Sequence, residues 1–186
     1  MRKLKLFSLL CLLLIGVGQV WATDALTTFA NKTSGTWAQN TSPLPCATGG
    51  NEWESSVAPY GWDNSDRGLQ FTCTASVGAT VALTSSDFQN KIIKSVSVVA
   101  SRNKTYDVNL SVSVNGNTLG TGDAGANNQS NATLTTSDDT GINCGTGNIE
   151  VTLSTGAPAS QPKSMYIKSI TVTYEESGSS TKPTLF

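Results

Sequence analysis

The chain has 186 residues, with 12 lysines and arginines against 13 aspartates and glutamates, and it contains no histidine. The lack of histidine excludes His-based catalytic triads and His-ligated zinc sites. A net charge of −1 argues against a nucleic-acid partner, which requires a basic surface. Only 13% of the residues are charged, whereas Ser, Thr, Asn and Gly are abundant, as is typical of extracellular β-proteins.

The first 22 residues have the features of a signal peptide. Arg2, Lys3 and Lys5 precede a short apolar run from Phe7 to Val17, and Val20-Trp21-Ala22 fits a cleavage site, so we expect cutting after Ala22. The run is too short for a membrane-spanning helix, so we expect contact with a membrane only during export. The mature chain would keep nine basic and thirteen acidic residues, a net charge of −4, and would be secreted or lie at the cell surface.

Alternation of apolar and polar residues then predicts a series of β-strands in the chain. The predicted strands cover 25–30, 36–39, 69–74, 77–83, 92–100, 106–115, 117–120, 132–134, 148–154 and 164–176. Asn115-Gly116 predicts a tight hairpin turn, because this pair readily adopts two positive φ angles. No stretch of ten or more residues after the signal has helical apolar spacing.

This pattern predicts an all-β fold, an antiparallel, jelly-roll-like β-sandwich of about 8–10 strands. We expect one domain over residues 23–176, with the strand at 25–30 beside the strand at 164–176. Residues 177–186 are rich in Ser and Gly, which predicts a linker or tail, and further domains would follow in a longer parent chain.

Two of these strands share a sequence pattern. Ile92-Ile93-Lys94-Ser95-Val96 is echoed by Tyr166-Ile167-Lys168-Ser169-Ile170. By strict alternation, the isoleucine before each Lys-Ser step would face away from the apolar residues after it. We therefore predict a β-bulge at each Lys-Ser step, which reverses the facing.

The long segment over residues 40–67 shows no period, and so long an irregular stretch in a small domain is commonly functional. Its aromatic residues are interleaved with carboxylates. Sugar rings stack their C–H faces on aromatics, and their hydroxyl groups bond to carboxylates and amides. We therefore predict a carbohydrate-binding loop made by Trp53, Tyr60, Trp62, Asp63 and Asp66. The alternative is that these aromatics pack inward and only hold the loop on the sandwich.

The carboxylates of this loop also suggest two other functions, glycoside hydrolysis and calcium binding. Glu52, Glu54, Asp63 and Asp66 could serve as the carboxylate pair of a glycoside hydrolase, but loop carboxylates are usually just hydrated, so we do not expect an enzyme. Asp63-Asn64-Ser65-Asp66 could supply oxygen ligands to calcium. This segment offers about three oxygens, whereas calcium requires about six or more. We expect no other cofactor or metal.

Three cysteines remain after the signal, Cys46, Cys73 and Cys144, and they allow one internal disulfide. Cys73 alternates in phase with Leu69 and Phe71, which predicts a small buried side chain. If a bridge forms, the loop positions of Cys46 and Cys144 favour that pair.

The chain resembles modules of secreted, multi-domain surface proteins from Gram-negative gut and oral anaerobes. The resemblance rests on the signal peptide, Asp66-Arg67-Gly68-Leu69-Gln70-Phe71, Val81-Ala82-Leu83-Thr84-Ser85, Ile93-Lys94-Ser95-Val96 and the strand from Tyr166 to Tyr174. Such modules look like jelly-roll sandwiches of the carbohydrate-binding type, followed by a linker and a further domain. The matching residues are strand patterns, so no binding residue is carried over.

The leading hypothesis is therefore an exported, non-catalytic β-sandwich module that binds a glycan or cell-surface polysaccharide through its aromatic loop. The rival hypothesis is a structural or adhesive spacer domain without a small ligand. A glycoside hydrolase is the third.

Overall fold

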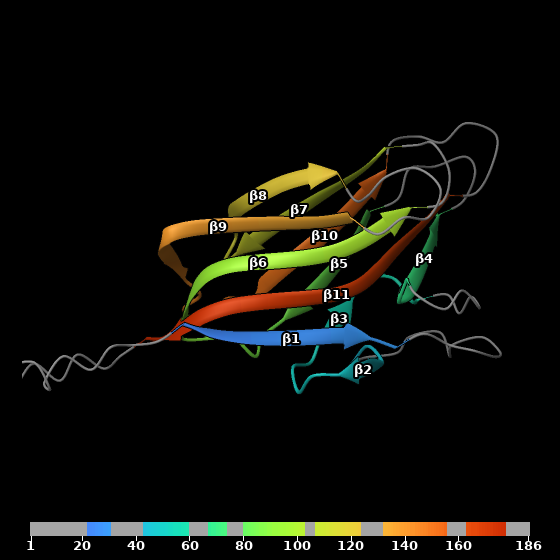
Figure 1. Ribbon diagram of the computed structural model, residues 1–186. Coiled ribbons are helices and arrows are strands. Elements are labelled where there is room, and N and C mark those ends of the chain that lie inside the picture. Colours follow the sequence, from blue (N-terminus) through green and yellow to red (C-terminus); the bar gives the residue numbers. More distant parts are fainter. Residues whose placement is uncertain are drawn as a thin grey trace, which may run out of the picture. The chain divides into compact units, whose positions relative to one another are not determined.

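The computed structural model contains eleven β-strands in the part of the chain that it describes (Figure 1). It describes residues 22–30, 43–59, 67–73, 80–102, 107–123, 132–155 and 163–177, without the side chains of 72, 73, 132 and 163. The strands are β1 (Thr23–Phe29), β2 (Cys46–Thr48), β3 (Glu54–Ser55), β4 (Leu69–Cys73), β5 (Thr80–Ser85), β6 (Lys91–Arg102), β7 (Val108–Val114), β8 (Asn117–Asp123), β9 (Ala132–Asn143), β10 (Ile149–Thr155) and β11 (Lys163–Glu176).

Two antiparallel sheets form a β-sandwich, which confirms the predicted fold class. One sheet has the order β2-β1-β11-β6-β9, with β4 also paired to β11, and the other has the order β3-β5-β10-β7-β8. The count exceeds the predicted eight to ten strands because the short β2 and β3 lie in the segment that we predicted to be irregular. No helix in the described residues is long and apolar enough to span a membrane.

Three of the predicted chain segments fall mainly outside the described residues. These are the signal peptide over residues 1–22, the strand at 36–39 and the tail at 177–186, of which only Ala22 and Ser177 are described.

The core lies between the two sheets and follows the predicted alternation. In β7 and β10 every second side chain is buried, and the intervening Ser, Thr, Asn and Glu residues face outward. The two strands pair in register, so that Val112 lies beside Val151 and Leu110 beside Leu153. Burial of each such branched side chain contributes about 1.5–3 kcal/mol to folding.

Strand β11 is the centre of the larger sheet. Along one edge it pairs with β6 from Met165 to Glu176. Along the other edge it pairs first with β4 and then with β1, and the change of partner occurs at Lys168. The pairing of β1 with β11 confirms the prediction that the first strand lies beside the last strand.

Both predicted bulges are present. The register between β11 and β6 shifts between Ile167 and Ser169, and the register between β6 and β9 shifts between Ile93 and Ser95. As a result Ile93 is buried together with Val96, and Ile167 together with Ile170, although strict alternation would place the members of each pair on opposite faces.

The segment that leads into β4 attaches this strand to β11. The Arg67 guanidinium lies over the Tyr166 ring at 4.8 Å, and Gln70 donates a hydrogen bond to the Ser164 hydroxyl at 2.9 Å. Gly68 has a φ of 80°, and a Cβ there would lie 2.0 Å from the carbonyl oxygen of Ile167. Only glycine allows so close an approach of the two backbones at this point.

The turn between β7 and β8 has positive φ angles at Asn115 (50°) and Gly116 (76°), which confirms the predicted hairpin. Strand β9, by contrast, is much longer than the predicted 132–134. It is an edge strand with a largely polar sequence, so apolar alternation does not reveal it. Its buried Thr136 satisfies its hydroxyl by donating to the carbonyl oxygen of Val96 at 3.3 Å.

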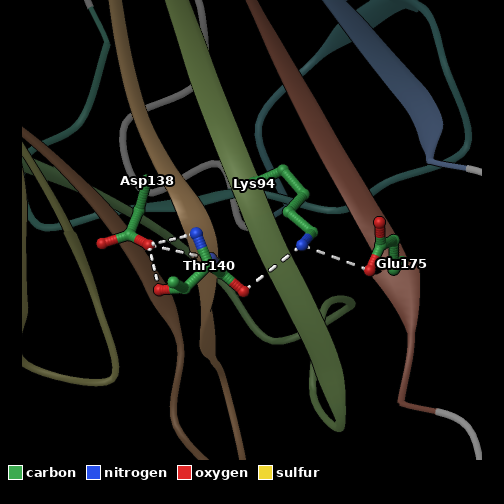
Figure 2. Close-up of polar contacts among 5 residues, drawn as sticks. Lys94, Asp138, Thr140 and Glu175 are labelled. Carbon is green, nitrogen blue, oxygen red and sulfur yellow. Dashed lines mark hydrogen bonds and ion pairs between the residues drawn. The ribbon is translucent and has the colours of Figure 1, made fainter.

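A four-residue excursion of β9 lies opposite the Lys94 bulge (Figure 2). One carboxylate oxygen of Asp138 accepts hydrogen bonds from the Thr140 hydroxyl at 2.6 Å, the Thr140 N–H at 2.9 Å and the Gly141 N–H at 2.8 Å. The Lys94 ammonium donates to the Thr140 carbonyl oxygen at 3.2 Å and lies 3.3 Å from a carboxylate oxygen of Glu175. The bulged residue of β6 thus links β9 to β11.

We expect Leu153→Ala to lower the free energy of unfolding by about 2–5 kcal/mol, because the side chain is fully buried and its removal leaves a cavity. The outward-facing neighbour Thr152 is the control, since Thr152→Ala leaves the core intact and should cost no more than about 1 kcal/mol. Chemical denaturation measures both. Equal effects at the two positions would contradict the assigned facing of β10.

The hydrogen bond from the Thr140 side chain, followed by that from the Gly141 backbone, lowers the pKa of Asp138 below its ordinary value of 3.8. A lowered folded-state pKa stabilises the fold above the ordinary aspartate pKa, and this contribution is lost as the pH falls through the folded-state value. We expect Asp138→Ala to lower the melting temperature at neutral pH, with a deficit that shrinks in acid. The exposed neighbour Asp139→Ala is the control, and a deficit independent of pH would contradict this assignment.

Candidate functional site

A polar cleft of about 120 Å³ lies beside β3 in the smaller sheet. Its lining combines two carboxylates, two hydroxyl groups and one amide, from Glu52, Glu54, Thr84, Ser86 and Asn148. None of these five lining residues is basic or aromatic.

The burial of Trp53 determines where the two carboxylates of the cleft lie. The Trp53 side chain is 0% exposed, and its neighbours Glu52 and Glu54 are both exposed. In an extended segment, side chains alternate between the two faces, so an inward Trp53 turns both glutamates outward. The Leu44 N–H donates to the Trp53 carbonyl oxygen at 2.7 Å, which ties this segment to the residues that precede β2.

Backbone contacts position the wall that carries the glutamates. In the pairing of β3 with β5, Glu54 lies opposite Thr84, which is another lining residue. The Glu52 N–H donates to a carboxylate oxygen of Asp87 at 2.6 Å. Asp87 lies in the turn after β5, so the cleft wall is tied to the end of that strand.

The segment between β9 and β10 contributes the amide of the cleft. Asn148 immediately precedes β10, and its carbonyl oxygen accepts the Asn115 N–H at 2.9 Å. The Gln89 side chain donates to the carbonyl oxygen of Thr146 at 2.9 Å and connects this segment to the turn after β5. The Asn148 side chain is left exposed at the cleft.

The prediction that Trp53 offers its ring to a ligand is wrong. The indole packs against Phe88, with ring centroids 6.4 Å apart, and its N–H donates to the Thr27 hydroxyl at 3.3 Å. Trp53 therefore follows the packing alternative, because burying its large apolar ring stabilises the sandwich more than exposing it would. The other predicted ligand-binding residues, Tyr60, Trp62, Asp63 and Asp66, lie outside the described residues.

Of the cysteines whose side chains the structure describes, neither Cys46 nor Cys144 lines the cleft. Cys46 and Cys144 are free thiols, so the disulfide that we favoured between them is wrong. Cys46 lies on β2, at the edge of the larger sheet opposite to β9, and Cys144 follows β9, so the fold separates them. Burial and the nearby Glu52 carboxylate raise the pKa of Cys46, and burial raises the pKa of Cys144. The side chain of Cys73 is not described.

No group of three or more His, Cys, Asp or Glu residues in the described ranges is arranged to hold a metal ion. The predicted calcium segment, Asp63-Asn64-Ser65-Asp66, lies outside those ranges.

The cleft residues can recognise a polyhydroxylated ligand by hydrogen bonding. Carboxylates accept hydrogen bonds, hydroxyl groups donate and accept, and the amide of Asn148 does both through different atoms. The sequence pointed to Glu52 and Glu54 as candidate carboxylates, but it gave no sign of Thr84, Ser86 or Asn148. Each of these three lies at or beside a strand end, so only the strand register brings them to the glutamates.

No protein-family model matches the chain, and no curated protein matches it either. Among solved structures, the chain is similar to the CBM36-1 domain of a multidomain xylanase from the hindgut metagenome of Trinervitermes trinervoides, with 17% identity and a TM-score of 0.43 over 81% of this chain and 96% of that domain. It is also similar to TmCBM61 in complex with β-1,4-galactotriose, with 15% identity and a TM-score of 0.43 over 64% of this chain and 86% of that one.

A third similar structure is the carbohydrate-binding module CBM36 in complex with calcium and xylotriose. Its identity to this chain is 14% and its TM-score is 0.40, over 81% of this chain and 98% of that module. At these TM-scores, no ligand and no binding residue is carried over to this chain.

We expect Trp53→Ala to lower the free energy of unfolding by about 3–5 kcal/mol, because it removes a fully buried aromatic ring. Thr27→Val removes the hydroxyl that accepts the indole N–H, leaves this buried donor without a partner and should cost about 1–3 kcal/mol. Chemical denaturation of both variants and of the double variant measures the two costs. Full stability of Trp53→Ala would contradict the buried position of this ring.

Proposed function

We propose that this chain is an exported, non-catalytic module that binds a carbohydrate in the cleft beside β3. The observation that carries the proposal is the lining of this cleft by carboxylates, hydroxyl groups and an amide. These groups match the hydroxyl groups of a sugar, which both donate and accept hydrogen bonds. Export is proposed from the signal-peptide pattern of residues 1–22.

The position of the two glutamates favours binding over hydrolysis. Glu52 and Glu54 belong to one short segment and line the same wall of the cleft. Hydrolysis of a glycoside requires two carboxyl groups on opposite sides of the scissile bond. The described part of the cleft therefore supports recognition of a sugar rather than its cleavage.

A spacer domain without a small ligand is the second candidate. The burial of Trp53 favours it, because this aromatic residue of the predicted loop serves to pack the fold. The two functions differ in one measurable property, the specific retention of an oligosaccharide.

We expect the protein to bind at least one soluble oligosaccharide on a glycan array and in isothermal titration calorimetry. Thr84→Val and Asn148→Ala each remove hydrogen-bonding atoms from the cleft and should weaken binding by about 2- to 10-fold. Thr171→Val, on the outer face of the larger sheet, is the matched control and should leave affinity unchanged. Absence of binding to every glycan tested would favour the spacer instead.

A further inference from the structure

Asn115 and Gly116 form the tip of the hairpin between β7 and β8, and they are the one Asn-Gly pair in the sequence. Both residues are exposed, and both have positive φ angles. A Cβ at Gly116 would meet no other atom within 4 Å, so the space around this residue is open. The main chain of this pair is therefore accessible to water.

An Asn-Gly pair has a chemical reactivity of its own. The backbone nitrogen of the residue after an asparagine is able to attack the side-chain carbonyl carbon of that asparagine. A side chain on the following residue hinders this approach, and glycine has none. The exposed hairpin tip thus combines the reactive pair with access for the water that completes the reaction.

We infer that Asn115 is a site of spontaneous deamidation, and that its conversion loosens the segment that brings Asn148 to the cleft. The inference does not depend on what the cleft binds. It concerns a covalent change of the chain itself, with water as the co-reactant and ammonia as the product released.

The reaction balances without an enzyme or a cofactor. The Gly116 nitrogen forms a bond to Cγ of Asn115, and the side-chain nitrogen leaves as ammonia with the proton of the Gly116 N–H. Water then opens the resulting five-membered succinimide at one of its two carbonyl carbons. Addition at Cγ gives aspartate. Addition at the former backbone carbonyl carbon gives isoaspartate, in which the main chain runs through the side chain.

The hairpin slows this reaction, because ring closure requires the backbone at Asn115 to rotate out of the turn. The turn connects β7 to β8, which is the edge strand of the smaller sheet. Segments at exposed edges open locally at a small free-energy cost. We therefore expect conversion in the folded protein, at a lower rate than in the unfolded chain.

Both products alter the contacts of Asn115 with the segment before β10. The Asn115 N–H donates to the carbonyl oxygen of Asn148 at 2.9 Å. The Asn115 side chain lies against Gly147, where a Cβ would be 2.3 Å from its oxygen. Either product places a negative charge against this segment, and isoaspartate also lengthens the main chain of a tight turn. Because Asn148 supplies the amide of the cleft, the change reaches the cleft lining.

Asn90 is an internal control for the role of glycine. Its φ of 60° is close to the 50° of Asn115, but the next residue is Lys91, whose side chain hinders the attack. Asn115→Gly is the matched variant, because a Gly-Gly pair also fits this turn and has no amide to lose. Thermal melting verifies that the variant is folded.

The first experiment incubates the folded protein at slightly alkaline pH and follows it by peptide mapping with mass spectrometry. We expect a mass increase of about 1 Da at Asn115, with isoaspartate detected there, while Asn90 keeps its amide. The protein unfolded in guanidinium chloride should convert faster at Asn115. Conversion in the unfolded chain but none in the folded protein would overturn the site, and equal conversion at Asn90 would overturn the role of glycine.

The second experiment measures hydrogen exchange in the separated isoaspartate form. We expect the N–H of residue 115 to exchange about 10-fold faster than in fresh protein, because its bond to Asn148 is weakened. The Ala30 N–H, which donates to the Pro45 carbonyl oxygen at 3.0 Å beside the larger sheet, should exchange at an unchanged rate. Unchanged exchange at residue 115 would overturn the effect on the cleft segment.

Discussion

The sandwich depends on how strands β6 and β11 change the facing of their side chains partway along their length. Each strand has a buried isoleucine before a bulged lysine and buried apolar residues after it, so without the bulge one half of each strand would turn its apolar side chains to water. In β11, Lys168 also marks the point where the neighbouring strand changes from β4 to β1. The bulge at Lys168 thus keeps both halves of β11 facing the core. At the same position β4 ends and β1 begins its pairing along one edge of β11.

The candidate cleft depends on that core through Trp53. Its ring contacts Phe88, whose ring lies 5.7 Å from that of Tyr174 on β11, and its N–H bonds to Thr27 on β1. The segment that carries Glu52 and Glu54 is therefore held by the larger sheet, while its backbone pairs with β5 of the smaller sheet. Under the proposed function, this support would reduce the ordering entropy that has to be overcome when a ligand binds.

Much of the fold could be predicted from the sequence, because alternation over a whole strand reports which face is buried. Val108 to Val114 and Ile149 to Thr155 follow it throughout, and the Lys-Ser steps showed where it had to break. Most of strand β9, beyond the predicted 132–134, escaped prediction because an edge strand with polar residues on both faces carries no such pattern. For Trp53, the sequence allowed both a stacking surface and a core residue, and only tertiary packing decides between them. Thr84 and Asn148 could not be found, because strand register brings them to the cleft.

The pairing of β1 with β11, from Thr23 opposite Tyr174 to Thr28 opposite Ser169, has a consequence for how the protein folds. The contacts that close the larger sheet join nearly the two ends of the domain, which gives a high contact order and slow folding by the standards of small proteins. While the chain is being synthesised, β1, β4 and β6 must all wait for the same late partner. The nascent chain would therefore expose unpaired strand edges until its final strand emerges from the ribosome, and only then would native structure form cooperatively.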